Sequence, residues 1–373
     1  MSIDELCAWI RLARTPGLDV ESAKLAVTAA GGAAALLAAP ARRLTGLDLP
    51  DETVARLRAL GRIDVERDVA WLAASDHHLV PCTSRDYPPL LAKTPGAPIA
   101  LYVAGDPALL AVAQLAIVGS RNPTAAGAET AFAFAEFLST AGLTITSGLA
   151  QGIDAAAHRG ALAGGGRTVA VCGTGLDLVF PREHTELARD IAARGALVSE
   201  FPIGTPGRRE NFPQRNRIIS GLALGTLVVE AARRSGSLIT ARHAAEQGRE
   251  VFAIPGSIHN PLARGCHALI RQGAKLVENA DDVLAELPAL AGALAQIRHR
   301  PATQSAEIGA GELDKEYKIL LDALGFEPAS VDQLVERSGF SAEVVASMLL
   351  ILELQGLVEA RAGGTYCRNF ARR

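Results

Sequence analysis

Small polar residues and arginines follow apolar runs of this chain at the points where those runs end. The run LAIVGSR ends in Gly119, Ser120 and Arg121, and the run LTITSGL contains Ser147 and Gly148. Arginine suits a phosphate because its planar guanidinium donates two parallel hydrogen bonds and stays charged. Glycine lets the backbone come close to an anion. These residue types therefore indicate a site that binds an anion, although Arg121 could instead pair with a loop carboxylate.

A basic cluster lies further along the chain, in residues 208–217, where four arginines accompany a single acidic residue. A helix predicted to open at Pro213 would carry Arg215 and Arg217 in its first two turns, where cations oppose the helix dipole. An anionic partner would offset that cost. Phe212 could stack on a base or pack as a hydrophobic staple. A solvated basic face is the alternative, and we favour the anion site because the cluster lies at strand tips.

Asp154 and His158 are four residues apart on one predicted helix. Such a pair could do acid–base work. In a structural role, Asp154 would complement the helix dipole and pair with His158. We favour the structural role because no serine or cysteine nucleophile is placed beside them.

Several common sites are not indicated. The five cysteines are scattered without a CxxC pair, so we interpret them as free thiols and expect no metal site. The sequence has no GxxxxGK[ST] string for ATP phosphates. A dinucleotide fingerprint begins at Gly173 but has Leu178 where its third glycine belongs. We therefore predict no catalytic residue and no cofactor.

The composition of the chain limits which kinds of nucleic-acid or membrane binding are possible. The net charge of −3 over 373 residues excludes a protein that coats polyanions with its whole surface, so nucleic-acid binding must come from clustered charge. Aromatic residues make up only 4%, which favours tracking of a nucleic-acid backbone over stacking of many bases. No run of about 18 apolar residues occurs, so we expect a cytoplasmic protein that does not bind membranes.

The apolar runs predict a doubly wound α/β fold. The runs are short, rich in β-branched residues, and too continuously apolar for a strand with one solvent-exposed face. This pattern is typical of parallel strands with helices on both sides. Predicted helices at 128–140, 153–163, 183–194 and 237–247 alternate with them. Each helix is followed by a glycine that we expect to be a left-handed cap, namely Gly142, Gly164, Gly195 and Gly248. A strand near 274–277 and a helix from Asp281 complete the unit.

Four regions are predicted along the chain. Residues 1–80 form a small helical domain of SAM or helix-hairpin-helix type, and residues 81–288 form the Rossmann-like domain with an extended lead-in. Residues 289–312 are a linker, and residues 313–373 have the helix and hairpin layout of a winged helix. The helix predicted at 341–355 contains no lysine or arginine, so reading of duplex DNA is not expected there.

The motifs IVGSRNPTAAG, SGLAQGIDAAAH, GTGLDLVFPREH, FPQRNRIISGL, EAARRSGSLIT and VFAIPGS, in this order, resemble the DNA-processing protein A (DprA/Smf) family. The resemblance covers about residues 81–287. It implies a protein that is not an enzyme, binds and protects incoming single-stranded DNA, and helps load the RecA recombinase in natural transformation or recombination. It also implies a homodimer joined through the Rossmann-like domain. The chain departs from the family pattern at Ala126, Phe180 and His184.

The resemblance also implies which residues hold the strand. Arg121 would grip a phosphate, and Arg182 stands where the family often has a basic residue. The full predicted DNA-binding set is Gly119, Ser120, Arg121, Ser147, Gly148, Arg182, Phe212, Arg215, Asn216, Arg217, Ser235, Gly236 and Ser237.

Two alternatives stay open. A phosphoribohydrolase-like, nucleotide-processing enzyme on the same fold would use Glu230 as its acid, but no PGGxGTxxE string is present. A transcription regulator that senses a nucleotide would need a charged recognition helix, which residues 341–355 do not provide.

Overall fold

The structure is a computed structural model that describes residues 1–15, 17–40, 55, 64–287, 315–325, 328–342, 344–345, 348–349, 352, 357–361 and 365–368. The chain forms a larger unit that contains the main sheet and a smaller C-terminal unit, and each is described by itself. The predicted linker, 289–312, lies outside the described residues.

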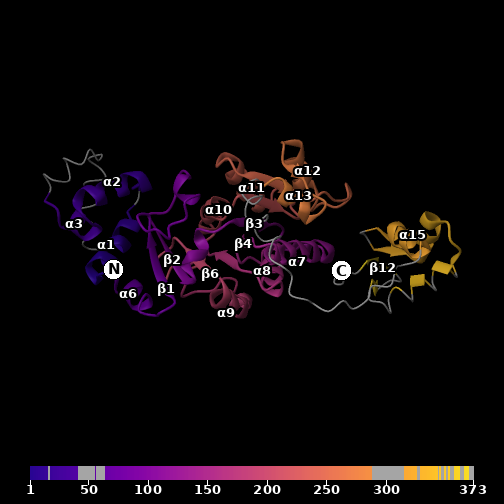
Figure 1. Cartoon of the computed structure of the whole chain (residues 1–373), viewed down its shortest axis with the longest axis horizontal. Coiled ribbons are helices and arrows are strands. Elements are labelled where there is room, and N and C mark those ends of the chain that lie inside the picture. Colours follow the sequence, from indigo (N-terminus) through magenta and orange to yellow (C-terminus); the bar gives the residue numbers. More distant parts are fainter. Residues whose placement is uncertain are drawn as a thin grey trace, which may run out of the picture. The chain divides into compact units, whose positions relative to one another are not determined.

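The larger unit is built on a nine-stranded sheet of order β1-β2-β6-β5-β4-β3-β7-β8-β9 (Figure 1). The strands are β1 (His77–Pro81), β2 (Ala100–Gly105), β3 (Gln114–Val118), β4 (Thr144–Ser147), β5 (Thr168–Val171), β6 (Ala196–Ser199), β7 (Gly225–Val228), β8 (Glu250–Ala253) and β9 (Lys275–Leu276). Strands from β6 to β9 in this order pair in parallel, and β1 and β2 pair antiparallel at one edge. The predicted doubly wound, mostly parallel sheet is confirmed.

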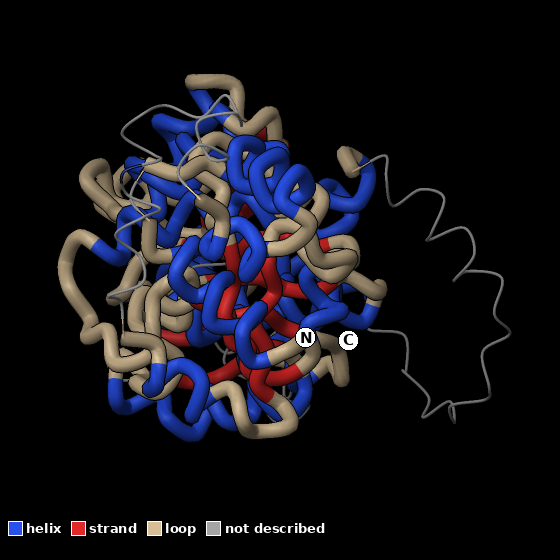
Figure 2. Tube along the Cα trace, turned by 90° about the vertical axis from the view of Figure 1, so that its left-hand side faces the viewer, coloured by secondary structure: helices blue, strands red, loops and turns tan. Residues whose placement is uncertain are grey.

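Helices cover both faces of the sheet, and Figure 2 shows strands enclosed by helices. The helices are α7 (Ala125–Thr140), α8 (Ile153–Ala163), α9 (Thr185–Arg194), α10 (Asn211–Leu222), α11 (Ser237–Glu246), α12 (Arg264–Arg271) and α13 (Ala280–Ala285). In β3, Leu115 and Ile117 pack with α7 and α8, whereas Ala116 and Val118 pack in the core that includes α10. Burial on both faces explains why the strands are continuously apolar.

Some predicted boundaries differ from the structure. Helix α10 begins at Asn211 rather than at Pro213, because a proline is tolerated in the first turn, where its missing N–H has no helical partner. Helix α9 begins at Thr185 because a 3-10 turn, Arg182–His184, precedes it. Strand β6 and helix α12 were not predicted. Both are short, and α12 has a strongly one-sided pattern over eight residues only.

The predicted glycine caps are right at two helices and wrong at two. Gly142 and Gly248 have φ of 96° and 67°, which is the left-handed region. Gly164 and Gly195 have φ of −70° and −151°. At Gly195 the reason for glycine is space, because a Cβ there would lie 2.1 Å from the Thr168 carbonyl oxygen.

The N-terminal helices are α1 (Ile3–Ala13), α2 (Val20–Ala30), α3 (Ala33–Ala38) and α6 (Glu66–Trp71). The chain's own carboxylates occupy two of their N-termini: Asp19 accepts from the Ser22 N–H, and Glu5 accepts from the first N–H groups of α3. Asp68, 1% exposed, joins α6 to the sheet by accepting from the Tyr102 hydroxyl at 2.6 Å. These helices therefore form a structural layer packed against β2.

The C-terminal unit contains α15 (Lys315–Leu324), β10 (Ala329–Ser330), α16 (Val331–Ser338), β11 (Val358–Arg361) and β12 (Thr365–Arg368). The strands pair antiparallel in the order β10-β12-β11, so β11 and β12 form the wing. Leu320, Leu334 and Leu349 are fully buried in its core. The predicted winged helix is confirmed, while most of the helix predicted at 341–355 lies outside the described residues.

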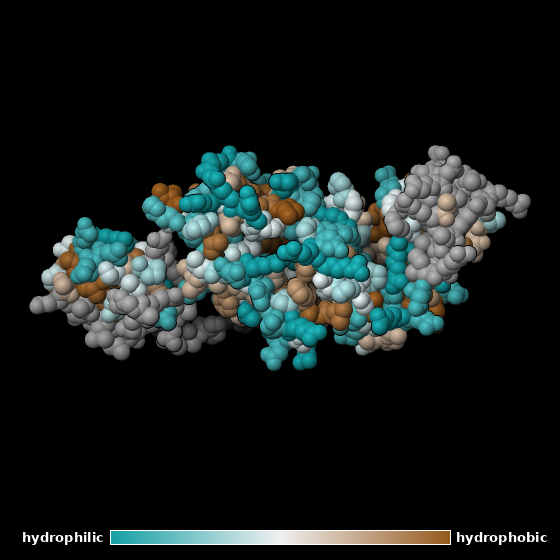
Figure 3. Space-filling view, turned by 180° about the vertical axis from the view of Figure 1, so that it is seen from behind, coloured by the Kyte–Doolittle hydropathy of each residue, from teal (hydrophilic) through white to brown (hydrophobic). Residues whose placement is uncertain are grey.

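Hydrophilic side chains cover much of the face drawn in Figure 3, with apolar residues in small groups. Among the described residues, no helix has the length and hydropathy needed to cross a bilayer.

Candidate nucleic-acid interface

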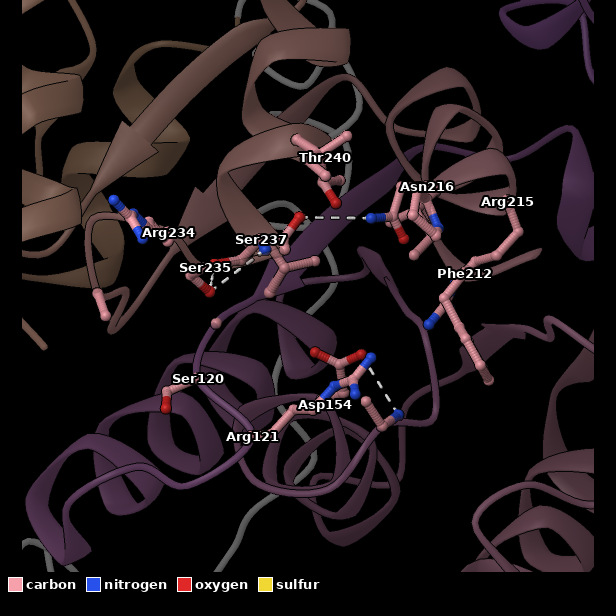
Figure 4. A pocket seen from close by; sticks show the side chains of 18 of the residues that line it. Ser120, Arg121, Asp154, Phe212, Arg215, Asn216, Arg234, Ser235, Ser237 and Thr240 are labelled. Carbon is pink, nitrogen blue, oxygen red and sulfur yellow. Dashed lines mark hydrogen bonds between the residues drawn. The ribbon is translucent and has the colours of Figure 1, made fainter. Parts of the chain in front are cut away.

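A hollow of about 750 Å³ lies at the carboxyl ends of β3 and β7. The chain leaves β3 toward β4 on one side and reaches β7 on the other, so this is the point where the strand order reverses. Ligands of open α/β sheets bind at such points because loops diverge there. The hollow opens between the β3 and β4 loops and the helices α10 and α11 (Figure 4).

A second hollow of about 460 Å³ shares Arg121, Ala150, Phe180, Phe212 and Arg215 with the first. The two hollows therefore form one continuous depression, which we call the groove. The second hollow adds Gly148, Gln151 and the turn Pro181–Glu183. The groove thus runs from the tips of β4 and β5 to the N-terminus of α11.

Four exposed arginines, which we call the rim arginines, line the groove: Arg121, Arg182, Arg209 and Arg234. They come from four different loops, after β3, β5, β6 and β7. None forms an ion pair with another described residue, so their charges are available to a ligand. The Arg121 guanidinium instead lies 5.7 Å from the centroid of the Phe212 ring, a cation–π contact that leaves its charge in place.

Two aromatic rings stand where the hollows meet. Phe180 and Phe212 have their centroids 5.2 Å apart at a 40° tilt, and Phe180 is 50% exposed. Phe212 lies so close to the tip of β5 that a Cβ on Gly173 would be 2.9 Å from the ring. Phe212 is therefore part of the groove wall, where a base can stack on it.

The loop between β4 and α8 is an anion-binding turn that the protein fills with its own carboxylate. Asp154 accepts from the N–H groups of Gly148 at 3.1 Å and Ala150 at 3.4 Å. Leu149 between them has φ of 58°, a conformation that L residues rarely adopt, and its carbonyl bonds to the His184 ring at 2.9 Å. The Gly148 N–H is therefore occupied, although Gly148 lines the second hollow.

Arg215 forms the floor of the groove rather than its rim. The residue is 4% exposed, one guanidinium nitrogen donates to the Val171 carbonyl, and the same group lies against Gly148. Burial raises the pKa of Asp154, while the nearby Arg215 and two backbone N–H groups act in the opposite direction. Arg215 therefore places a buried positive charge near the Asp154 carboxyl group, beneath the rim arginines.

Asp154 does not pair with His158, so that part of the structural interpretation is wrong. The Thr168 hydroxyl donates to the Ile145 carbonyl, so the 2.7 Å bond from the His158 Nδ1 must have histidine as donor. His158 Nε2 then carries a lone pair, is buried and has no partner among the described residues. Burial, with help from Arg215, lowers the pKa of His158 to about 3. The Asp154 carboxylate instead accepts hydrogen bonds from the backbone N–H groups of the preceding loop, which lie within reach.

Two predicted residues lie outside the groove. Arg217 donates to both carboxylate oxygens of Glu200, at 2.7 and 2.6 Å, and to the Gly96 carbonyl at 2.9 Å. Ser147 is fully buried and donates to the Ile117 carbonyl at 2.6 Å. Each has a partner from a distant segment that the sequence pattern does not reveal.

The other predicted residues come together. Gly119, Ser120, Asn216 and the turn Ser235–Ser237 line the first hollow. The hydroxyls of Ser235 and Ser237 are 2.7 Å apart at the start of α11. A helix N-terminus with hydroxyls is a ready site for a phosphate beside Arg234.

The lining residues that were not in the predicted set include Arg209, Arg234, Asn122 and Thr240. Both arginines belong to adjacent pairs in the sequence, Arg208 with Arg209 and Arg233 with Arg234. Which member of each pair faces the groove depends on loop geometry.

Glu230 is 8% exposed, accepts from the Asn260 amide at 3.4 Å and lines neither hollow. In the part of the chain that the structure describes, no three His, Cys, Asp or Glu residues are placed to hold a metal ion.

Comparison with known proteins identifies the family. The family model described as DNA recombination-mediator protein A matches residues 78–288, and the DprA winged helix domain matches residues 301–364. The chain belongs to the DprA/Smf family. The motif resemblance is thereby confirmed, and the chain is a DNA-processing protein of the DprA type.

DprA-family relatives match most of the chain. Protein Smf of Escherichia coli is 45% identical over 321 residues, 86% of this chain and 84% of that protein. DNA processing protein DprA of Streptococcus pneumoniae is 48% identical over 200 residues, 54% of this chain and 71% of that protein.

Solved DprA structures share the fold. The X-ray structure of DprA from Streptococcus pneumoniae superposes with a TM-score of 0.65 at 36% identity, covering 75% of this chain and 98% of that one. DNA processing protein A from Helicobacter pylori, whose single-stranded DNA binding mode has been studied structurally, gives a TM-score of 0.52 at 26% identity over 57% and 95% of the chains.

Proposed function

We propose that this protein binds single-stranded DNA in the groove by its phosphates, protects the incoming strand in the cytoplasm, and helps load the RecA recombinase during natural transformation or recombination. We further propose that it acts without catalysing a reaction and works as a homodimer joined through the Rossmann-like domain.

One observation carries the proposal: four exposed arginines from separate loops converge on one groove, and none is neutralised by a described carboxylate. Asp154, the acid in the first hollow, is buried beside Arg215 and bonded to backbone N–H groups. Repeated cationic contacts spaced along a groove suit a polyanion better than a single phosphate. The aromatic pair Phe180 and Phe212 adds a place for an unpaired base, which a duplex does not offer.

The relatives support the biological part of the proposal. The matched family is named for mediation of DNA recombination, and the Helicobacter pylori protein binds single-stranded DNA. A mediator hands a strand to a recombinase, so the strand must be held by contacts that can be released in steps. Exposed arginines in a shallow groove suit such release, because each phosphate contact is weak and screened by salt.

The enzyme alternative has less support. A phosphoribohydrolase-like reaction would need Glu230 beside the bound nucleotide, but Glu230 is turned toward Asn260 and lines neither hollow. The rim arginines bind phosphate without supplying a general acid or base.

Fluorescence anisotropy with labelled single-stranded and duplex oligonucleotides of equal length, titrated across salt concentrations, tests the proposal. We expect a clear single-strand preference and a log–log salt slope of about −0.7 per phosphate contact, with several contacts implied. Equal affinity for duplex would indicate that the DNA-binding site lies in the winged helix and not in the groove. Absence of binding to either form would overturn the proposal and direct attention to nucleotide hydrolysis through Glu230.

A further inference from the structure

An exposed arginine of the N-terminal helices lies close to the groove without lining it. Arg67 belongs to α6, and its guanidinium packs against Gly204 in the loop that follows β6. The packing is close, because a Cβ on Gly204 would lie 2.5 Å from one guanidinium nitrogen. Arg67 forms no ion pair with another described residue and lines neither hollow. Its positive charge is therefore not neutralised by the part of the fold that the structure describes.

Buried contacts fix the position of Arg67 beside this loop. Asp68, the next residue, is 1% exposed and accepts from the Ile203 N–H at 3.2 Å. On the other side of the loop, the Gly175 N–H donates to the Thr205 carbonyl at 3.0 Å. The loop is therefore held between α6 and the turn that follows β5, and Arg67 keeps its place relative to the carboxyl end of β5.

The same loop leads from Arg67 to the groove. Gly207, three residues after Gly204, lies against the Phe180 ring, from which a Cβ on that glycine would be 3.3 Å away. Arg209, two residues further on, is one of the rim arginines. Five residues of extended chain span at most about 18 Å, so Gly204 and Arg209 are no further apart than that. A strand that leaves the groove past Phe180 along this loop therefore meets Arg67 next.

The Arg67 guanidinium has donors to spare for such a strand. An exposed arginine usually pairs with a nearby carboxylate, and Asp177 is the expected partner because it accepts from the Gly204 N–H at 2.8 Å. Asp177 and Arg67 nevertheless form no ion pair. Arginine carries five N–H donors in a planar fork that fits a phosphate, and those of Arg67 have no acceptor among the described residues.

We propose that Arg67 binds a backbone phosphate of the DNA strand where the strand leaves the groove past Phe180. The N-terminal helices thereby extend the binding surface beyond the Rossmann-like domain. Only strands long enough to pass Phe180 reach this contact, so Arg67 makes the affinity depend on the length of the strand. This inference rests on the proposed single-strand binding and adds a contact outside the groove.

Anisotropy titration of the full-length protein with labelled oligothymidylates of increasing length tests it. Arg67→Gln removes the charge and keeps much of the side chain that packs on Gly204. We expect this variant to bind the shortest oligonucleotides as the parent does, and the longer ones about 2- to 5-fold more weakly, as for the loss of one exposed charge contact. For the longer oligonucleotides the log–log salt slope should become shallower by about 0.7.

Two further variants serve as controls. Arg189→Gln removes an exposed charge on α9 and should leave the affinity unchanged at every length. Arg121→Gln removes a rim arginine and should weaken binding at every length, because Arg121 lies inside the groove. Thermal unfolding should show the same stability for Arg67→Gln and the parent, because the side chain is exposed.

The outcomes separate this inference from the proposed function. Equal affinity of Arg67→Gln and the parent at every length overturns the contact with Arg67 and leaves single-strand binding standing. A loss of the same size at every length also overturns it, because the residue would then act on the groove itself or on folding. If the parent binds no strand of any length, the proposed function and this inference are both overturned.

Discussion

The guanidinium of Arg121 lies over the ring of Phe212 at 5.7 Å from its centroid. Arg121 follows β3 and Phe212 lies in the first turn of α10, so the fold brings together two segments far apart in sequence. The ring attracts the cation by about 0.5–1 kcal/mol at an exposed site, without neutralising it. The contact therefore orients the charge over the groove and leaves it free to hold a phosphate.

Replacing Arg121 with alanine should weaken single-strand binding by about 1–3 kcal/mol, the range for a lost charge-assisted contact. The log–log salt slope should become shallower by about 0.7, because one phosphate contact is lost. Anisotropy titrations at several salt concentrations measure both quantities. Arg189→Ala, which removes an exposed charge on α9, is the matched control. Unchanged binding in folded Arg121→Ala would remove this residue from the site.

Arg217→Gln should leave single-strand affinity within about 2-fold of the parent, because the guanidinium is committed to Glu200 and lies outside the groove. The variant should instead be less stable by about 1–3 kcal/mol, since Glu200 loses a charge-assisted partner in a half-buried site. Denaturant unfolding and anisotropy measure the two effects. A large loss of affinity at unchanged stability would place Arg217 back in the interface.

Gly148→Ala should destabilise the protein by about 1–3 kcal/mol, the usual range for overpacking. The new Cβ would lie 1.9 Å from a guanidinium nitrogen of Arg215, which cannot swing away because it is buried and bonded to Val171. Gly236→Ala is the control: a Cβ there meets nothing within 4 Å, so stability should change by about 1 kcal/mol at most. Equal stability of the two variants would contradict the packing described for Arg215.

His158 should make the protein less stable as the pH falls. Its pKa is lowered from 6.5 to about 3 in the folded protein, so between these values the unfolded chain binds a proton that the folded one does not. The stabilisation is present above pH 6.5 and declines toward pH 3, by about 1.4 kcal/mol per pH unit.

His158→Asn keeps a donor for Thr168 and cannot titrate. The free energy of unfolding of this variant should therefore decline less steeply with falling pH in the same window. Urea unfolding at a series of pH values measures the slope, independently of any loss of packing that lowers the whole curve. Parallel curves for the parent and the variant would show that His158 is not the group responsible.

Deleting residues 313–373 should leave most single-strand affinity intact, because the groove is lined entirely by residues of the larger unit. Anisotropy with the truncated protein measures this. Loss of binding in a truncated protein that is folded would indicate that the winged helix binds the single-stranded DNA.

The sequence by itself determined the architecture and the chemistry of the site. Continuous apolar runs indicate strands buried on both faces, and the glycines, serines and arginines at their ends indicate an anion site at the carboxyl edge of a parallel sheet. These properties are local: they depend on the order of residue types within a run and on the loop that follows it. The order of the motifs along the chain also indicated the DprA/Smf family.

Only the tertiary structure decided which charges face the ligand. Arg215 and Arg217 are two residues apart on one helix, yet Arg215 lies under the groove and Arg217 is paired with Glu200. Asp154 fills the turn at Gly148 because the loop bends its N–H groups toward the start of α8. In each case the partner comes from another loop or strand. The contacts depend on distances through space, which the spacing of residues along the chain does not contain.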